Sequence, residues 1–233
     1  MTVAPPAAVV AGRLGILGGT FDPVHLGHLA IAEEAREELG LERVLFVPAG
    51  DPWQKANRAV TPGAHRLAMV ELAIAGNPAL AAGRLELDRP GPSYTVDTLA
   101  ALAADARAAG RAPDLWFILS AEALDGLPTW REPERILALA GLAVVPRPGG
   151  PPDAAERFAA RYPGARAVFL DGPNLAISGT QVRARVAAGR SIRYLVPPAV
   201  EAYLTRHALY RGPTAATPPP AAAPPPAAAP PEA

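Results

Sequence analysis

The chain has 233 residues, half of them hydrophobic, and its 22 basic and 22 acidic residues cancel at neutral pH. That balance argues against a nucleic-acid partner or a membrane surface, which both call for an excess of basic residues. The lack of cysteine in the sequence excludes disulfide bonds and thiolate metal sites, and we expect a cytoplasmic protein.

Outside the proline-rich residues 212–231, no uncharged run reaches the ~18 residues that a membrane-spanning helix needs, and residues 1–12 do not resemble a signal peptide. We expect residues 1–12 to form a flexible N-terminus and residues 13–212 to form one domain. Residues 213–233 contain nine prolines, which interrupt a helix, and nine alanines, which are too small to build a core. This last segment is predicted to be a disordered tail.

Short apolar runs alternate with segments of helical periodicity throughout residues 13–212. In chain order, the predicted strands are 13–17, 43–47, 84–87, 115–119, 142–145 and 167–170. The predicted helices are 26–39, 62–75, 96–108, 132–140, 154–161, 181–188 and 198–207. Continuous apolar strands separated by helices are typical of a parallel sheet covered on both faces. The sequence therefore predicts an α/β protein with a Rossmann-like, doubly wound sheet, whose ligands bind at the carboxyl ends of the strands.

The first predicted strand leads into GGTFDPVHLGH at 18–28, where two histidines stand three residues apart. Glycines let backbone N–H groups approach a ligand, and the start of a helix carries partial positive charge. The spacing is neither that of a dinucleotide-binding G-x-G-x-x-G nor that of a P-loop. His25 and His28 share one helical face, and an anion between them would offset the unfavourable interaction of protonated imidazole with the helix dipole. The alternatives are two surface histidines or a zinc pair, for which no third ligand lies nearby in the sequence.

A second segment, ISGTQVR at 177–183, has a similar character. Ser178 or Thr180 can cap the helix that follows, and Arg183 is expected in its first turn. A cation is unfavourable at this end of a helix unless an anion binds there. We expect the two helix starts to converge at one edge of the sheet and to bind phosphate groups together.

These two segments resemble the signatures of the H-x-G-H nucleotidyltransferases, H-x-G-H after the first strand and I-S-S-T-x-x-R near the end of the domain. Within that superfamily the chain is similar to the nicotinate-nucleotide adenylyltransferase family from about residue 13 to residue 210. The similarity lies in PWQK at 52–55, HRLAMVELA at 65–73, PSYTVDTL at 92–99, LWFILSAEAL at 115–124, Trp130, VVPRPG at 144–149, SIRYLVPPAVEAYL at 191–204 and LY at 209–210. The resemblance implies adenylyl transfer from ATP to nicotinate mononucleotide, which gives nicotinate adenine dinucleotide and pyrophosphate in NAD biosynthesis.

The resemblance also implies roles for residues that would bind ATP. His28 would donate to the α-phosphate, and His25 would lie beside it on the phosphates. Arg183 would hold the β- and γ-phosphates, and Lys55, the only lysine in the sequence, would add positive charge from a loop. The nucleotide crevice would be lined by Gly18 and by the backbone of Gly19, Thr20 and Phe21. Ser178 and Thr180 would hold the β- and γ-phosphates together with Arg183. Magnesium would arrive with ATP, and no metal site made only of protein ligands is expected.

On the acceptor side, the resemblance implies that Trp130 stacks on the nicotinate ring, although a core tryptophan is the alternative. Tyr94 and Thr95 would offer backbone N–H groups to the nicotinate carboxylate, and Glu122 would meet a ribose hydroxyl. The other two tryptophans are Trp116, which is expected in the core, and Trp53, which stays unassigned.

Three positions depart from the family pattern. Ser120-Ala121-Glu122 stands where the family has G-A-D, Gly179 replaces the second serine of I-S-S-T, and Gln54 replaces a histidine. These departures leave two alternatives open. One is an adenylyltransferase for another acceptor, such as nicotinamide mononucleotide or phosphopantetheine, and the other is a non-catalytic nucleotide-binding protein of the same fold.

Overall fold

The structure, a computed structural model, describes residues 12–51, 60–146, 153–172 and 175–211. Its centre is a sheet of six parallel strands in the order β3-β2-β1-β4-β5-β6. These strands are β1 (Arg13–Gly19), β2 (Arg43–Pro48), β3 (Leu80–Ala82), β4 (Asp114–Ser120), β5 (Ala140–Val145) and β6 (Ala167–Phe169). The chain starts in the middle, winds outward to β3, returns to place β4 beside β1, and winds outward again. The predicted doubly wound sheet is confirmed.

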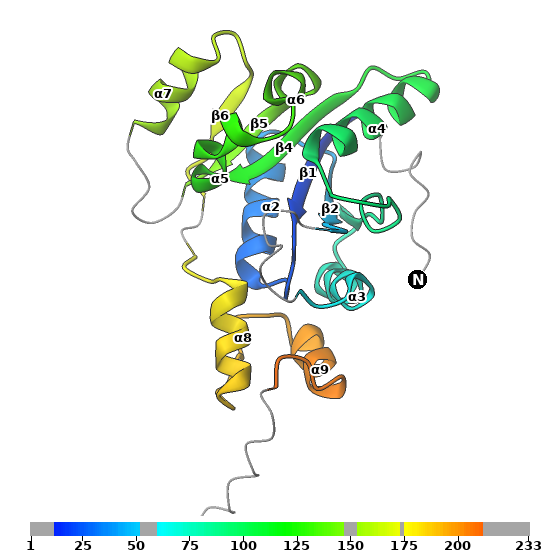
Figure 1. Ribbon diagram of the computed structural model, residues 1–233, viewed down its shortest axis with the longest axis vertical. Helices are drawn as coiled ribbons and strands as arrows, with labels where there is room; N and C mark the ends of the chain where they lie inside the picture. Colours follow the sequence, from blue (N-terminus) through cyan, green and yellow to red (C-terminus); the bar gives the residue numbers. More distant parts are fainter. Residues whose placement is uncertain (1–11, 52–59, 147–152, 173–174, 212–233) are drawn as a thin grey trace, which may run out of the picture.

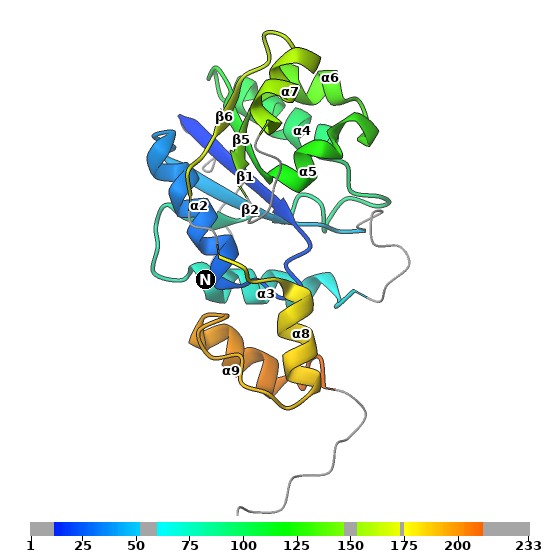
Figure 2. The same cartoon turned by 90° about the vertical axis from the view of Figure 1, so that its left-hand side faces the viewer.

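Helices cover both faces of this sheet (Figures 1 and 2). One layer contains α2 (Leu26–Glu38) and α3 (Gly63–Ile74), and α9 (Pro198–Arg206) packs on α3. The other contains α4 (Thr95–Ala108), α5 (Ala121–Asp125), the short 3-10 helix η2 (Leu127–Thr129), α6 (Pro133–Leu139) and α7 (Ala154–Arg161). Figure 2 shows α2 on one side of the strands and the group from α4 to α7 on the other.

Both faces of the central strands are buried, which explains their continuous apolar sequences. In β4, Phe117 and Leu119 belong to the core under α4, whereas Trp116 and Ile118 belong to the core under α2. Successive strand residues point to opposite faces, so a strand between two helical layers needs apolar residues at every position. The expectation that Trp116 lies in the core is confirmed, since only 8% of it is exposed.

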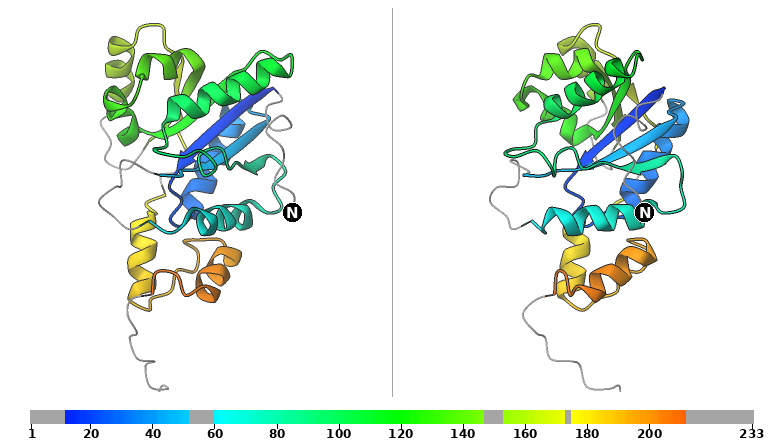
Figure 3. Two further views of the ribbon diagram at one scale, coloured as in Figure 1. Left: turned by 45° about the vertical axis from the view of Figure 1, so that its right-hand side comes forward. Right: turned by 90° about the vertical axis from the view of Figure 1, so that its right-hand side faces the viewer.

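The last two helices lie at one end of the molecule, where α3 separates α9 from the sheet (Figures 1 and 3). They are α8 (Gly179–Ala187) and α9. The segment between them reaches the start of α2, where the Leu26 N–H donates to the Leu195 carbonyl at 2.9 Å. On α9, the Tyr203 hydroxyl lies 2.8 Å from Nδ1 of His65 on α3. The C-terminal region is thus attached to α2 and α3.

A buried guanidinium joins three loops on the α3 side of the sheet. Arg66 of α3 is 1% exposed and donates to the carbonyls of Thr20 at 2.9 Å and Thr61 at 2.7 Å, with a longer contact to Gly50 at 3.4 Å. Burial lowers the pKa of Arg66, because removing the charged form from water is unfavourable. The loops after β1 and β2 are therefore fixed to α3 by one side chain.

The third predicted strand is wrong in position. The edge strand is Leu80–Ala82, and the segment Arg84–Leu87 forms turns instead. The Gly83 N–H makes the last ladder bond, to the Phe46 carbonyl, and the Asp88 N–H then donates to the Arg84 carbonyl at 2.9 Å. The alternating apolar and polar residues of RLEL imitate a strand, but the chain turns away from the sheet before they begin.

The other predicted elements occur within a few residues of their expected bounds, and α5 and η2 were not predicted. Trp53, Gln54 and Lys55 lie outside the described residues, as do the predicted tail and all of the predicted N-terminus except Gly12. In the part of the chain that the structure describes, no helix has the length and apolar character required to span a membrane.

The packing of β5 on β4 gives a stability prediction. A Cβ added to buried Gly141 would lie 2.8 Å from the Trp116 ring, so Gly141→Ala should lower the free energy of unfolding by about 1–3 kcal/mol. Gly126 is the control, because its backbone is already helical and an added Cβ would meet nothing closer than 3.4 Å. Urea denaturation should show no loss for Gly126→Ala, and an equal loss in both variants would contradict this packing.

Candidate active site

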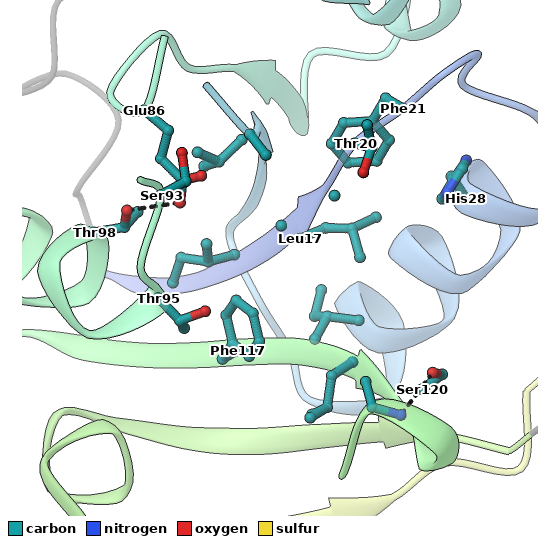
Figure 4. A pocket seen from close by; sticks show the side chains of 18 of the residues that line it. Leu17, Thr20, Phe21, His28, Glu86, Ser93, Thr95, Thr98, Phe117 and Ser120 are labelled. Atoms are coloured by element: carbon teal, nitrogen blue, oxygen red, sulfur yellow. Dashed lines mark hydrogen bonds between the residues drawn. The ribbon is translucent and has the colours of Figure 1, made fainter. Parts of the chain in front are cut away.

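A pocket of about 480 Å³ opens where the carboxyl ends of β1 and β4 lie side by side. The chain leaves these two neighbouring strands toward opposite faces of the sheet, and such a point is where doubly wound proteins bind ligands. Figure 4 shows His28 on α2 at one side of the pocket, Thr20 and Phe21 after β1, and Thr95 and Phe117 at the opposite side. The segment 178–180 and Arg183 also line it. The two predicted phosphate-binding segments therefore share one pocket.

The two histidines of the first segment are stacked on each other. His25 is the N-cap of α2, and its ring centroid lies 3.7 Å from that of His28 with the planes 24° apart. The backbone N–H of His25 donates to Nδ1 of His28 at 3.2 Å. A nitrogen that accepts a hydrogen bond carries no proton, so neutral His28 has its proton on Nε2. This arrangement makes Nε2 of His28 a hydrogen-bond donor.

Close packing around the histidines explains the glycines of this segment. A Cβ on Gly27 would lie 3.1 Å from Nδ1 of His25, so the glycine makes room for the ring. A Cβ on Gly19 would lie 3.0 Å from the ring of Phe21. That ring is buried and meets the His28 ring edge-on, with the centroids 5.0 Å apart. Phe21 thus supports His28 with its side chain, whereas the sequence had indicated only a backbone role.

The second segment begins α8 and reaches back to the first. Ser178 is the N-cap, and its hydroxyl oxygen accepts the Gln181 N–H at 3.1 Å. Because Ser178 and not Thr180 is the cap, the helix starts two residues earlier than expected. Arg183 therefore lies in the second turn, and the prediction of the first turn is wrong. Its guanidinium returns to the helix start, where it donates to Oγ1 of Thr180 at 3.0 Å and to the Asp22 carbonyl at 2.6 Å.

The charges of this half of the pocket suit a polyanion. Neither α2 nor α8 has an acidic residue in its first turn, so neither helix offsets its own positive end with a carboxylate. His25, His28 and Arg183 all line the pocket at these two helix starts. The site combines two helix dipoles, imidazole donors and a guanidinium, which is the chemistry that binds phosphate groups.

The opposite half of the pocket is aromatic and includes the start of α4. Tyr94 is the N-cap of α4 and Thr95 its first residue, one position earlier than the predicted start. Both line the pocket with Trp130, whose ring meets Phe117 edge-on at 5.9 Å. Backbone N–H groups at this helix start and a partly buried indole therefore line the same half of the pocket. Glu122 is not among the lining residues, because it lies exposed in α5 after the end of β4.

Residues 16–185 match the cytidylyltransferase-like family. A protein of Thermomicrobium roseum named as a probable nicotinate-nucleotide adenylyltransferase is 50% identical to the chain, over 88% of the chain and 95% of that protein. A protein of Roseiflexus sp. with the same name is 51% identical, over 85% of the chain and 98% of that protein. The chain belongs to the nicotinate-nucleotide adenylyltransferase family.

The fold agrees with this membership. The structure of the Plasmodium falciparum nicotinic acid mononucleotide adenylyltransferase complexed with NaAD superposes with a TM-score of 0.71, over 86% of this chain and 98% of that one. The two sequences are 17% identical, so this likeness concerns the fold.

The pocket wall contains a buried carboxyl group, that of Glu86, which the sequence analysis did not predict. Glu86 lines the pocket, is 8% exposed, and accepts the Thr98 hydroxyl at 2.7 Å (Figure 4). Beside it, the Ser93 hydroxyl oxygen accepts the Gly50 N–H at 2.9 Å. Burial raises the pKa of Glu86 above its ordinary value. These bonds attach the segment before Tyr94 to α4 and to the loop after β2. The RLEL pattern gave no signal for a buried acid.

The raised pKa of Glu86 predicts a pH-dependent difference between the protein and its Glu86→Gln variant. The folded state favours the neutral carboxyl of Glu86. The contribution of this group to folding stability is therefore complete below the ordinary pKa of glutamate, and it is lost as pH rises through the pKa in the folded state. Glutamine stays neutral throughout. The stability of Glu86→Gln relative to the unmodified protein should therefore improve between pH 4 and pH 7, as measured by urea midpoints. A difference that is constant over this range would contradict the assignment.

Proposed function

We propose that the chain transfers the adenylyl group of ATP to nicotinate mononucleotide, which yields nicotinate adenine dinucleotide and pyrophosphate in NAD biosynthesis. One observation carries the proposal: His28 at the start of α2 and Arg183 at the start of α8 face one pocket that also contains the start of α4 and Trp130. A phosphate-binding half and an aromatic half in one pocket suit the two substrates. The printed names of the relatives support this reading, and a cytoplasmic enzyme is part of the proposal.

The chemistry requires positioning more than proton transfer. An oxygen of the mononucleotide phosphate attacks the α-phosphorus, and the bond from that phosphorus to the oxygen bridging to the β-phosphorus breaks. The nucleophile is already an anion, so a strong general base is not needed. The protein has to align the two phosphates and stabilise the charge that develops on the α-phosphoryl and leaving oxygens.

The proposed roles follow the geometry of the pocket. Nε2 of His28 donates to an α-phosphate oxygen, with the ring held by Phe21 and by the His25 N–H. Arg183 binds the β- and γ-phosphates, and Lys55, which lies outside the described residues, adds positive charge. The nucleotide contacts are proposed for His25, Gly18, Gly19, Thr20, Phe21, Ser178 and Thr180.

At the acceptor end, Trp130 is proposed to stack on the nicotinate ring. The N–H groups of Tyr94 and Thr95 are proposed to bind the nicotinate carboxylate, which the positive start of α4 favours. Glu122 is kept as the proposed partner of a ribose hydroxyl, although it is not among the residues that line the pocket.

Magnesium is proposed to arrive bound to the triphosphate. Within the described ranges, no group of three or more histidine and carboxylate side chains is placed to hold a metal ion. Asp22 lines the pocket, but its side chain is 2% exposed and accepts the Tyr210 hydroxyl. We therefore assign no protein ligands to the ion. When bound, it would neutralise part of the phosphate charge.

The proposed function is tested by pyrophosphate release from ATP with three acceptors assayed side by side. We expect nicotinate mononucleotide to give a higher kcat/KM than nicotinamide mononucleotide or phosphopantetheine, because helix N–H groups favour a carboxylate over a neutral amide. A preference for either other acceptor would contradict the assigned substrate. Lack of turnover with all three would contradict an enzymatic role.

For catalysis, we predict that His28→Ala lowers kcat by roughly 10²-fold or more, as expected when a donor to developing negative charge is lost. His207→Ala is the control, because that histidine packs on Tyr203 of α9 and is not among the pocket-lining residues. Steady-state kinetics on both variants, with circular dichroism to verify folding, would measure this. Turnover near that of the unmodified protein in His28→Ala would contradict the role.

A further inference from the structure

The end of the described chain returns to the first phosphate-binding segment. Tyr210 lies 188 positions after Asp22, and its hydroxyl donates to Oδ1 of Asp22 at 2.6 Å. Tyr210 has a φ of +61°, in the left-handed region that bulky side chains seldom adopt. Burial and the Asp22 carboxylate raise the pKa of Tyr210, so the hydroxyl keeps its proton and stays a donor. A strained backbone is thus maintained where the tyrosine hydroxyl meets the aspartate.

Asp22 connects this tyrosine to Arg183. The side chain of Asp22 is 2% exposed, and Oδ2 lies 4.0 Å from Nη1 of Arg183. The same guanidinium nitrogen bonds the Asp22 carbonyl at 2.6 Å. A Cβ on Gly179 would lie 2.9 Å from that carbonyl oxygen, so α8 begins directly against it. One carboxylate oxygen of Asp22 therefore accepts the Tyr210 hydroxyl, and the other lies toward Arg183.

A buried carboxylate needs hydrogen-bond donors, and it takes the nearest one if a donor is removed. The Arg183 guanidinium, with Nη1 4.0 Å from Oδ2, is a strong donor beside the Asp22 carboxylate when the Tyr210 hydroxyl is removed. A direct ion pair between them would draw Arg183 toward Asp22 and neutralise the charge that faces the pocket. The tyrosine hydroxyl, by bonding Asp22, leaves Arg183 directed by the Asp22 carbonyl and Thr180.

We propose that Tyr210 is a positioning residue for nucleotide binding, which acts through Asp22 to keep Arg183 available to the ATP phosphates. The inference rests on the proposed function only in that Arg183 binds those phosphates. It explains why a residue outside the pocket lining, at the far end of the chain, is attached to the loop after β1. Gly179 contributes to the same arrangement, because a side chain there would push α8 away from Asp22.

The test compares Tyr210→Phe with Tyr203→Phe. Each variant keeps its ring and loses one hydroxyl in the C-terminal region, but the Tyr203 hydroxyl bonds His65 and not the pocket loop. We expect Tyr210→Phe to raise the KM for ATP about five- to tenfold, with the KM for the mononucleotide within twofold. Tyr203→Phe should leave both unchanged. An unchanged KM for ATP in Tyr210→Phe, or equal changes in the two variants, would overturn the proposal.

A double-variant cycle tests whether the effect passes through Arg183. In the Arg183→Ala background, Tyr210→Phe should raise the KM for ATP no further, because the group that the tyrosine positions is gone. Independent, multiplying losses would overturn the proposed route, since they would mean that Tyr210 stabilises the loop in general.

Binding of a non-hydrolysable ATP analogue, measured by calorimetry without acceptor, separates this inference from the proposed function. Weaker analogue binding by Tyr210→Phe, with the affinity of Tyr203→Phe unchanged, supports the role of Tyr210 even if nicotinate mononucleotide is not the acceptor. Equal affinity in Tyr210→Phe and the unmodified protein overturns it, whichever acceptor the enzyme uses.

Discussion

The parallel pairing of β1 with β4 is the constraint on which the rest of the site depends. Two neighbouring strands send the chain to opposite faces of the sheet, so their ends are left uncovered and a crevice forms between the departing loops. The loop after β1 then leads to α2, and the proposed acceptor-side residues lie at the start of α4 and after β4. Arg66 fixes the loops after β1 and β2 to α3 through their carbonyls. The pocket is thus preorganised by hydrogen bonds of the backbone and one buried cation.

Electrostatic design differs between the two halves of the pocket. The phosphate half relies on helix ends without acidic first turns, on stacked imidazoles and on Arg183, all of which favour negative charge. The other half relies on Trp130, Phe117 and the start of α4, with Glu86 held in the wall by Thr98. A ligand that carries both negative charge and an aromatic ring can interact favourably with both halves of the pocket, whereas free triphosphate can interact with only one.

Sequence patterns predicted a parallel, doubly wound sheet with helices on both faces, because burial of both faces requires continuous apolar strands, as in Trp116–Leu119. They also predicted that His25, His28 and Arg183 meet, because two helix starts with basic residues are unfavourable without a shared anion. They failed where a residue's role depends on a partner distant in the chain. Glu86 lies in a segment that was predicted to be a strand, Arg66 lies in a predicted helix, and no pattern in these segments or around Asp22 indicated burial. Their burial arises from three loops and a C-terminal tyrosine that no local pattern reveals.

The contacts that Arg183 and Tyr210 make with Asp22 span 161 and 188 positions of the chain. During synthesis the ribosome releases β1 and α2 long before these residues exist. A nascent chain can therefore pair its first strands without yet having a complete nucleotide site. Because these contacts form only when Arg183 and Tyr210 have been synthesised, a bound nucleotide can stabilise the fold only near the end of translation. A chain that ends before α8 would lack Arg183, Tyr210 and the second of the two helix starts that line the pocket.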